Sequence, residues 1–433
     1  MKLQNFLRAL LITGCAFMFS SILPIPATNL FDPYDILLVK PFNKDRCFDF
    51  YVANESAFQT RAFQADPEDM ININRGAYPD RGGYPESKSQ AQFSRKVNIL
   101  QIWQPKQNIF NSLHPNEFVE KDLVNVTGSL DVPMNMMFAA HCSLPWDIMI
   151  GVYLPLYAVK LKDVAWGYPE NPTLQPQVNQ QLNYLEKAGS FASLHDGWQQ
   201  VGIGDLAALV WWARGFPQAK RWLKLVNVSV RGGMTFPTGK DANLANLFGL
   251  PLGNNAGAGF LMGGTIELGL FNHLKFGLDA EFLQLLGSKK TRRFKHQAYE
   301  TDLVFTEPFG ELYLDHVAHY PETQAFADPG FLQHYTIYMA GYDLCGANVT
   351  LAYQHKRQHE TSYMLNTAKV NPEIIDIAES LQDWTMHNLV CMVDYTPDFK
   401  AVSPTFTAFV KYGFNGKRVI SCNTVGAQVS LDF

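Results

Sequence analysis

Residues 224–236, KLVNVSVRGGMTF, alternate apolar and polar side chains along most of their length. A period of two predicts a β-strand with one apolar face, because successive side chains of a strand point to opposite sides. A soluble sandwich hides such a face against a second sheet, whereas a transmembrane barrel turns it toward lipid. One face of this segment holds Val226, Val228, Val230 and Met234, and the other holds Leu225, Asn227, Ser229, Arg231 and Thr235.

The same alternation recurs along the chain, for example in residues 258–271, AGFLMGGTIELGLF. No apolar run after residue 30 reaches the roughly 18 residues that a membrane-spanning helix needs. The pattern predicts strands at residues 48–56, 126–140, 147–160, 201–213, 224–236, 258–271, 274–286, 331–343, 346–356, 384–395, 404–414 and 418–433.

The connections between these strands alternate in length, which decides between the two environments. The long ones are residues 57–125, 161–200, 237–257, 287–330 and 357–383, and the short ones are residues 141–146, 213–223, 272–273, 344–345 and 396–403. Short turns at one end and long loops at the other are typical of outer-membrane barrels, and a Greek-key sandwich does not sort its loops in this way. We therefore predict an all-β, transmembrane, antiparallel up-and-down barrel of about twelve strands, with short periplasmic turns and long extracellular loops.

An even strand number places both chain ends on the periplasmic side. Residues 96–103, KVNILQIW, also fit a strand, so ten or fourteen strands stay open. The last hairpin is an exception on the long-loop side, where Asn415-Gly416 predicts a tight turn. Interfacial rings are expected near strand ends, and on this map Trp146, Trp211, Trp212 and Trp222 lie at the short-turn ends.

Composition agrees with a barrel in a membrane. Of the 433 residues, 17% are charged and 13% are aromatic, so the surface has few charges and many rings. The net charge of −5 gives no indication of nucleic acid as a partner.

The first residues are typical of a secretory signal. Lys2 and Arg8 precede the apolar residues 9–23, and Ile25-Pro26-Ala27 offers a cleavage site. The alternative is the lipobox-like Ile12-Thr13-Gly14-Cys15, but the apolar stretch continues beyond its cysteine.

The domain prediction follows from this reading of the N-terminus. We expect a signal peptide at residues 1–27 and a single barrel domain at residues 28–433, located in the bacterial outer membrane. Residues 28–41 are apolar but too short to fill a wide lumen, so no N-terminal plug is expected.

Catalytic motifs are absent from the sequence, which has no GxSxG, HExxH or P-loop. His355, His359 and Glu360 lie in the run HKRQHE, whose histidine spacing suits a metal on a helix, but the run follows a predicted strand into a loop. The five cysteines after residue 27 show no zinc-ligand spacing. We expect no enzyme activity, no metal and no cofactor, with a membrane-embedded hydrolase as the less favoured alternative.

Charged residues on the polar strand faces are the candidate functional residues. A charge that faces lipid costs about 2–4 kcal/mol near the midplane, so these side chains are expected to point into the lumen. They either pair and hold the wall together or line a water-filled path, and their mixed sign favours pairing. We expect Arg231 and Glu267 to form a salt bridge, because their strands are adjacent. The candidate lumen-lining residues are Asp131, Arg231, Glu267, Asp279, Glu281, Asp394 and Lys411.

Residues 288–295, SKKTRRFK, bring five positive charges to a predicted long loop. Such a run is typical of a solvated loop, and the alternative is contact with lipopolysaccharide phosphates above the outer leaflet. The expected partners are therefore the lipid bilayer and lipopolysaccharide.

Two short motifs resemble a family of bacterial outer-membrane barrels. Residues 202–206 are GIGDL, and residues 234–240 are MTFPTGK. In the barrel group named after the MetA pathway of phenol degradation, a strand begins G-x-G-D-L and the next one ends in P-T-G. Glycine permits tight bends, and Pro-Thr-Gly stops pairing where a strand leaves a sheet. The resemblance, to channels of the FadL style, implies passive passage of small aromatic or apolar molecules.

The final segment, VGAQVSLDF at residues 425–433, alternates up to Phe433. A last strand of this kind resembles the signal that the barrel-assembly machinery reads, so Phe433 is expected to act in assembly.

We expect a passive channel or porin for uptake of small molecules, whose solute is left open. The alternative is a structural or surface-display barrel whose long loops bind partners.

Overall fold

A computed structural model of the chain describes residues 34–39, 48–63, 125–167, 183, 196–241, 251–254, 257–271, 273–293, 322–344, 346–365, 383–397, 403–417 and 419–433. The predicted signal peptide at residues 1–27 and the additional strand considered at residues 96–103 lie outside these ranges. Within them, no helix is long and apolar enough to cross a membrane.

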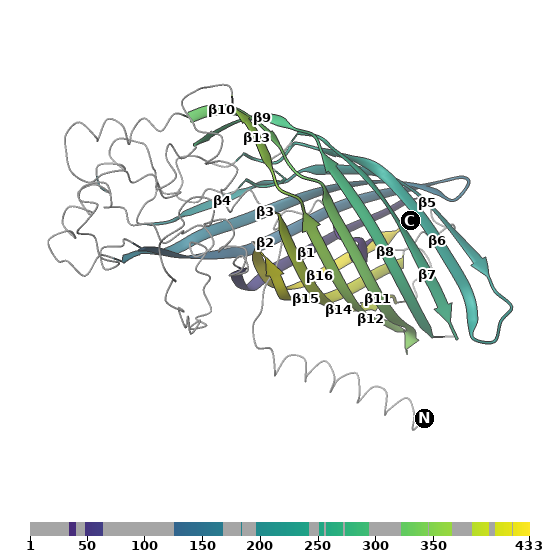
Figure 1. Ribbon diagram of the computed structural model, residues 1–433. Coiled ribbons are helices and arrows are strands. Elements are labelled where there is room, and N and C mark those ends of the chain that lie inside the picture. The colour runs from purple at the N-terminus through teal and green to yellow at the C-terminus, as the bar shows by residue number, and fades with distance from the viewer. Residues whose placement is uncertain are drawn as a thin grey trace, which may run out of the picture.

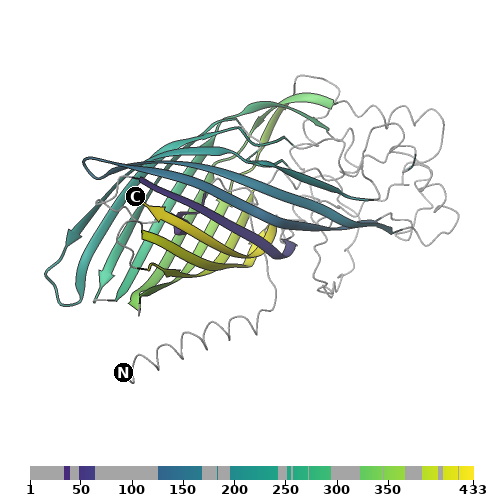
Figure 2. The same cartoon turned by 180° about the vertical axis from the view of Figure 1, so that it is seen from behind.

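Twelve strands of the described residues form one closed antiparallel ring, seen from the side in Figure 1 and from behind in Figure 2. Each strand of the ring pairs with the next one along the chain. The ring consists of β1 (Phe48–Phe63), β2 (Asn125–Leu144), β3 (Ile148–Gly167), β5 (Leu206–Pro217), β6 (Leu223–Phe236), β7 (Gly259–Leu270), β8 (Leu274–Leu285), β11 (Leu332–Leu344), β12 (Ala347–Gln358), β14 (Trp384–Tyr395), β15 (Ser403–Lys417) and β16 (Val419–Asp432).

The ring closes through β1, which pairs with β2 on one side and with β16 on the other. Asp49 lies opposite His141 of β2 and opposite Asp432 of β16. The backbone N–H of Phe433 donates to the carbonyl oxygen of Phe48 at 2.9 Å. Closure gives the first and last strands of the ring hydrogen-bonded partners on both sides, so neither presents a free edge to lipid.

The predicted transmembrane barrel is confirmed, and all twelve predicted strands are present. Short connections join neighbouring strands at one end, such as residues 145–147 between β2 and β3. Toward the long-loop end the strands run farther than predicted: β1 reaches Phe63, and β3 reaches Gly167. Both faces of a strand meet water outside the bilayer, so the alternation that marks the strand disappears there while backbone pairing continues.

The predicted turn at Asn415-Gly416 is wrong. Both residues lie within β15 and pair with β14, where Asn415 is opposite His387 and Gly416 is opposite Met386. Pairing with a neighbouring strand satisfies the backbone of these two residues and overrides the turn preference of Asn-Gly.

A second, three-stranded sheet lies at the long-loop end of the barrel (Figure 1). In it, β10 (Glu322–Asp328) pairs with β9 (Ser288–Arg293) and with β13 (Ser362–Leu365). Residues 288–293 are therefore a strand and not part of a loop, as was predicted, because β10 supplies the backbone partners that local sequence cannot reveal.

Burial follows the predicted alternation. On β6, Val230 is 55% exposed, whereas the next residue, Arg231, is 2% exposed. On β7, Met262 is 66% exposed, and on β16, Val429 is 42% exposed while Ser430 is fully buried. The exposed apolar side chains form the band that a barrel presents to lipid, and the buried polar ones point into its interior.

Trp211 departs from the predicted interfacial band. Its side chain is buried on the same face of β5 as Leu209, because the alternation of this strand turns both residues inward. Trp146 and Trp222 are exposed at the short-turn end, where interfacial rings were predicted.

The residues of the GIGDL motif interrupt a strand. β4 (Trp198–Ile203) and β5 both pair with β3, and Gly204 and Asp205 lie between them. The buried carboxylate of Asp205 accepts a hydrogen bond from the backbone N–H of Gly239 at 3.0 Å and another from that of Asn254 at 2.7 Å. Asp205 therefore connects the break between β4 and β5 to two segments of the loop between β6 and β7.

The PTGK motif completes the same junction. The hydroxyl of Thr238 donates to the carbonyl oxygen of Gly204 at 2.7 Å and accepts from the N–H of Leu206 at 2.9 Å. A Cβ atom on Gly239 would come within 2.2 Å of the carbonyl oxygen of Leu252, so only glycine fits there. The two motifs thus hold one junction together.

Val230→Lys is expected to destabilise the folded barrel by about 2–4 kcal/mol, because the charge would face lipid near the middle of β6. Ser229→Lys is the matched control, since it puts the same side chain on the interior face one residue away, and a smaller loss is expected. Urea titration of protein refolded into lipid vesicles measures both losses. Equal losses would contradict the orientation of β6.

Asp205→Asn is expected to lower the free energy of unfolding by about 1–3 kcal/mol, because a neutral amide replaces the acceptor of two charge-assisted hydrogen bonds. The temperature at which the protein loses its compact electrophoretic form measures the change. Asp328→Asn, at an exposed position of β10, is the control and should leave this temperature unchanged. Equal behaviour of the two variants would show that the junction does not stabilise the barrel.

Candidate functional site

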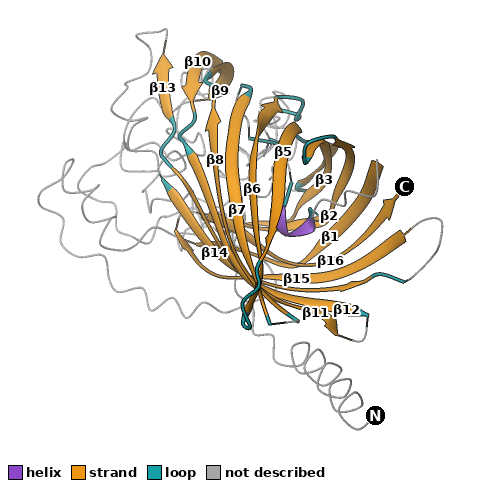
Figure 3. Ribbon diagram, turned by 90° about the vertical axis from the view of Figure 1, so that its right-hand side faces the viewer, coloured by secondary structure: helices purple, strands orange, loops and turns teal. Residues whose placement is uncertain are grey.

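Residues 34–39 lie inside the barrel, and Figure 3 shows their helical turn surrounded by strands. The turn is a 3₁₀ helix at Ile36–Leu38, and the carboxylate of Asp35 caps it by accepting a hydrogen bond from the N–H of Leu37 at 3.0 Å. We call residues 34–39 the plug segment. The expectation that residues 28–41 are too short to provide a plug is wrong, because long side chains project inward from the wall and meet the segment.

Tyr34 docks the plug segment on β3, β6 and β8. Its ring stacks on that of Tyr153, with the centroids 4.9 Å apart. Its hydroxyl donates to Oε2 of Glu281 and accepts from Nε of Arg231 at 3.2 Å. Burial, and then the charge of Glu281, raises the pKa of the Tyr34 phenol well above its ordinary value, so the phenol stays a neutral donor.

Arg231 is the centre of a buried charge network. Its Nη1 and Nη2 donate to the two carboxylate oxygens of Asp279 at 2.6 and 2.7 Å, and its Nε donates to Oε2 of Glu281 at 2.8 Å. The guanidinium carbon lies 5.2 Å from the centroid of the Trp211 ring. A bidentate pair with this geometry is strong and directional, so it fixes the groups that face Tyr34.

Asp35 binds a different part of the wall. Its Oδ2 lies 3.1 Å from Nζ of Lys411 on β15, and its Oδ1 accepts a hydrogen bond from Nε2 of Gln354 on β12 at 3.1 Å. Lys411 also lies 2.9 Å from Oε2 of Glu55 on β1. Lys411 therefore links the plug segment to the wall through two carboxylates.

The surroundings of Asp35 keep it ionised. Burial raises the pKa of this carboxyl, but the charges of Lys411 and His334 and the N–H of Leu37 lower it more, so the pKa lies below its ordinary value of 3.8. Asp35 is therefore a carboxylate at neutral pH, and its attraction to Lys411 is fully present.

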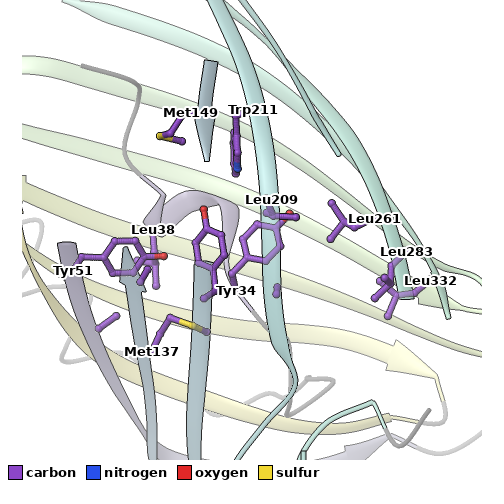
Figure 4. Close-up of a cluster of buried hydrophobic side chains, with 14 of the residues drawn as sticks. Tyr34, Leu38, Tyr51, Met137, Met149, Leu209, Trp211, Leu261, Leu283 and Leu332 are labelled. Carbon is purple, nitrogen blue, oxygen red and sulfur yellow. The ribbon is translucent and has the colours of Figure 1, made fainter. Parts of the chain in front are cut away.

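Apolar side chains also surround the plug segment, as Figure 4 shows for Tyr34 and Leu38. The carbonyl oxygen of Leu38 also accepts a hydrogen bond from Nε2 of Gln428 on β16 at 3.0 Å. The neighbouring buried side chains come from β1, β2, β3 and β5 and include Tyr51, Met137, Met149, Leu209 and Trp211.

A second buried polar group lies beside Tyr34. Nδ1 of His141 is 2.9 Å from Oδ2 of Asp49, and its Nε2 is 2.9 Å from the hydroxyl of Tyr153. Ser430 donates to the other oxygen of Asp49 at 3.2 Å. Both ring nitrogens of His141 are bonded to the wall, so this group connects β1, β2 and β3 and orients the ring on which Tyr34 stacks.

Four of the predicted lumen-lining residues, Arg231, Asp279, Glu281 and Lys411, gather around the plug segment. The other two interior residues lie elsewhere. Glu267 accepts from Asn227 at 2.7 Å and from Tyr338 at 3.1 Å, and it lies 3.2 Å from Lys275. Asp394 accepts from Thr407 at 2.5 Å.

The predicted salt bridge between Arg231 and Glu267 is wrong. Strand register places Arg231 opposite Gly263 and Glu267 opposite Asn227. Four positions along a strand separate the two residues by roughly 14 Å, so Arg231 reaches instead to Asp279 and Glu281 on β8.

Asp131 lies apart from the other candidates. A register shift between Asp131 and Met134 reverses the alternation of β2, so that Val132 is buried in place of Asp131. Asp131 pairs with Lys162, and both side chains are about a third exposed. A bulge of this kind cannot be seen in the period of the sequence.

Some residues around the plug segment were not singled out from sequence. Asp35 belongs to a stretch without alternation, and His141 lies in a predicted short connection. Glu55 and Gln354 are ordinary polar residues of predicted strands. The only signal was that the alternation of the strand turns them inward, and alternation does not say which side chains meet across a lumen.

The structure gives no support for a metal at the histidine run. His355 lies on β12, so an i, i+4 spacing separates it from His359 by roughly 13 Å. His355 instead contacts the ring of His387, with centroids 4.8 Å apart. No group of three metal-ligating side chains occurs in the part of the chain that the structure describes.

Comparison with known proteins gives only distant similarity. No family model matches the chain, and no curated protein matches it. Among solved structures, an outer-membrane channel from Pseudomonas putida F1 is 10% identical, with a TM-score of 0.47 and coverage of 90% of this chain and 96% of that one. The CymD monoaromatic hydrocarbon channel is 7% identical, with a TM-score of 0.28 and coverage of 89% and 88%. A FadL homologue from Pseudomonas aeruginosa is 7% identical, with a TM-score of 0.26 and coverage of 90% of both chains.

An even-numbered, closed antiparallel barrel with an apolar outer band is the architecture of bacterial outer-membrane proteins. The protein is an outer-membrane barrel.

Asp35→Asn is expected to loosen the plug segment, because it removes the charge that Lys411 and Gln354 bind. Hydrogen exchange of the backbone amides of residues 37–39 should speed up about tenfold or more at neutral pH. In the wild type the lowered pKa means that this protection is present above pH 3.8 and is lost as the pH falls below that value. Asp147→Asn, at a short turn, is the matched control. Unchanged protection in Asp35→Asn would show that this carboxylate does not hold the segment.

Proposed function

We propose that the protein is a passive channel for the uptake of small molecules across the outer membrane, and that the plug segment closes it at rest. The observation that carries the proposal is the polar barrel interior in which the plug segment is held. The proposed role is transport, with no chemical step assigned to the chain.

The barrel interior supports a path for solutes. A barrel that serves only as a scaffold can fill its centre with apolar side chains, as small barrels do. Here the buried inward residues include Arg231, Asp279, Glu281, Lys356 and Gln354. Ionisable groups buried in a lumen are expensive unless they are paired or meet water, and they mark solute pathways in membrane proteins.

The plug segment is attached in a way that permits release. Its contacts in the described residues are hydrogen bonds, one ion pair to Lys411, a ring stack and apolar packing, and its regular structure is a single 3₁₀ turn. Hydrogen bonds of this kind have modest net strength, because water replaces them when the segment leaves. A segment held in this way can exchange with a solute.

The partners follow from the location. The exposed apolar band faces the lipid bilayer, and we propose that the long-loop end contacts lipopolysaccharide. We also propose that residues 1–27 direct secretion, that residues 28–433 form the single barrel domain, and that the barrel-assembly machinery reads the last strand with Phe433. The backbone N–H of Phe433 donates to the carbonyl oxygen of Phe48, so Phe433 lies at the seam where the barrel closes.

Conductance in planar bilayers tests the channel. The wild type is expected to show brief openings, and Asp35→Asn is expected to stay open about tenfold longer because the closing segment is bound more weakly. Asp147→Asn should behave like the wild type. No current from any of the three proteins would exclude the channel, whereas equal current from all three would keep the channel and remove the plug segment from its gating.

A further inference from the structure

The plug segment shows which chemical groups the lumen is built to hold. Tyr34 presents a phenol and Asp35 presents a carboxylate, and each meets wall residues of matching chemistry. We propose that these wall residues form a binding site for small hydroxylated aromatic carboxylates, and that the plug segment occupies this site until such a solute displaces it. The inference rests on the proposed channel and names the class of its solute.

The phenol end of the site is formed by three strands. Tyr153 on β3 offers a ring face at 4.9 Å, Glu281 on β8 accepts the hydroxyl proton, and Arg231 on β6 donates to the hydroxyl oxygen. Two carboxylates face the one guanidinium of Arg231, so this end carries an excess of acceptors and favours a neutral group that donates. A phenol supplies both the ring and the proton.

The carboxylate end of the site offers one cation and one amide donor. Lys411 and Gln354 bind the carboxylate of Asp35 directly, at 3.1 Å each. Lys356 is buried on β12 on the same interior face as Gln354. Lys411 also pairs with Glu55, so an anion that replaces Asp35 restores the same arrangement of two carboxylates around one ammonium group.

The two ends are close enough for one small molecule. Tyr34 and Asp35 are consecutive, so their Cα atoms are only about 3.8 Å apart. Along the chain, six atoms separate the ring of Tyr34 from the carboxylate of Asp35, so one solute reaches both ends either through a linker of up to six atoms or through movement of the long, flexible side chain of Lys411. The solute 3-(4-hydroxyphenyl)propanoate carries the hydroxyl, the ring and the carboxylate in one molecule and repeats the side chain of Tyr34.

The site discriminates against purely apolar compounds. A hydrocarbon in this place would leave Glu281, Lys411 and Gln354 without the partners that the plug segment supplies. Sites built from buried hydrogen-bonding groups reject analogues that lack the matching group much more strongly than apolar pockets reject an added one. The structure thus favours polar aromatic acids over the apolar molecules that the FadL-style resemblance implies.

Solute-driven release of the plug segment tests the site in the full chain. Hydrogen exchange of residues 37–39 is followed while 3-(4-hydroxyphenyl)propanoate, 3-phenylpropanoate or 4-ethylphenol is titrated. The first solute is expected to accelerate exchange at the lowest concentration. We expect 3-phenylpropanoate to need about threefold to tenfold more, since it lacks one hydrogen bond, and 4-ethylphenol to need at least tenfold more, since it lacks the charge. Equal concentrations for all three, or faster release by 4-ethylphenol, would overturn the proposal.

Variants assign each preference to its residue. Glu281→Gln should abolish the preference for the hydroxyl, and Lys411→Gln should abolish the preference for the carboxylate, whatever either change does to the resting plug segment. Lys275→Gln is the matched control, because Lys275 pairs with Glu267 away from the plug segment, and it should keep both preferences. Preferences that survive both site variants would place binding elsewhere.

Release of the plug segment without conductance would refute the channel and leave the site, whereas conductance without solute preference would refute the site alone.

Discussion

The constraint on which this structure depends is that no backbone N–H or C=O of a strand can stay unpaired in hydrocarbon. A sheet meets it only by closing on itself, and here β1 pairs with both β2 and β16. Closure then separates two environments along every strand, because alternate side chains face lipid or the lumen. The exposed Val230 and the buried Arg231, one residue apart on β6, show how completely the two environments differ.

The interior has its own requirement, since ionisable groups placed there need partners. Arg231 is satisfied by two carboxylates of β8, and Lys411 is satisfied by Glu55 and by Asp35 of the plug segment. The wall is therefore complete only when something carries an anion to Lys411 and a hydroxyl to Glu281. A segment of the same chain supplies both groups, and this arrangement is the basis of the proposal that a solute of similar chemistry can replace it.

The two motifs that indicated a barrel family have a structural role at some distance from the plug segment's contacts. Asp205 and Thr238 hold the interrupted strand and the following loop together. They explain why short glycine-containing motifs carry the resemblance, since such a junction tolerates few residue types. They carry no information about the solute, because the choice of solute depends on the side chains that point into the barrel around the plug segment.

The sequence by itself determined the architecture: the strands, their even number, the sorting of short and long connections, and the face to which most side chains point. It could do so because lipid on one side and a polar lumen on the other impose a period of two that is local in sequence. Only the tertiary structure decided which inward groups meet. Register moved Arg231 away from Glu267 and toward Asp279, a bulge turned Asp131 aside, and the plug segment entered the lumen to meet Glu281 and Lys411. Those contacts join residues far apart in the chain, and alternation fixes the side of a strand that a residue occupies but not the partner across the barrel.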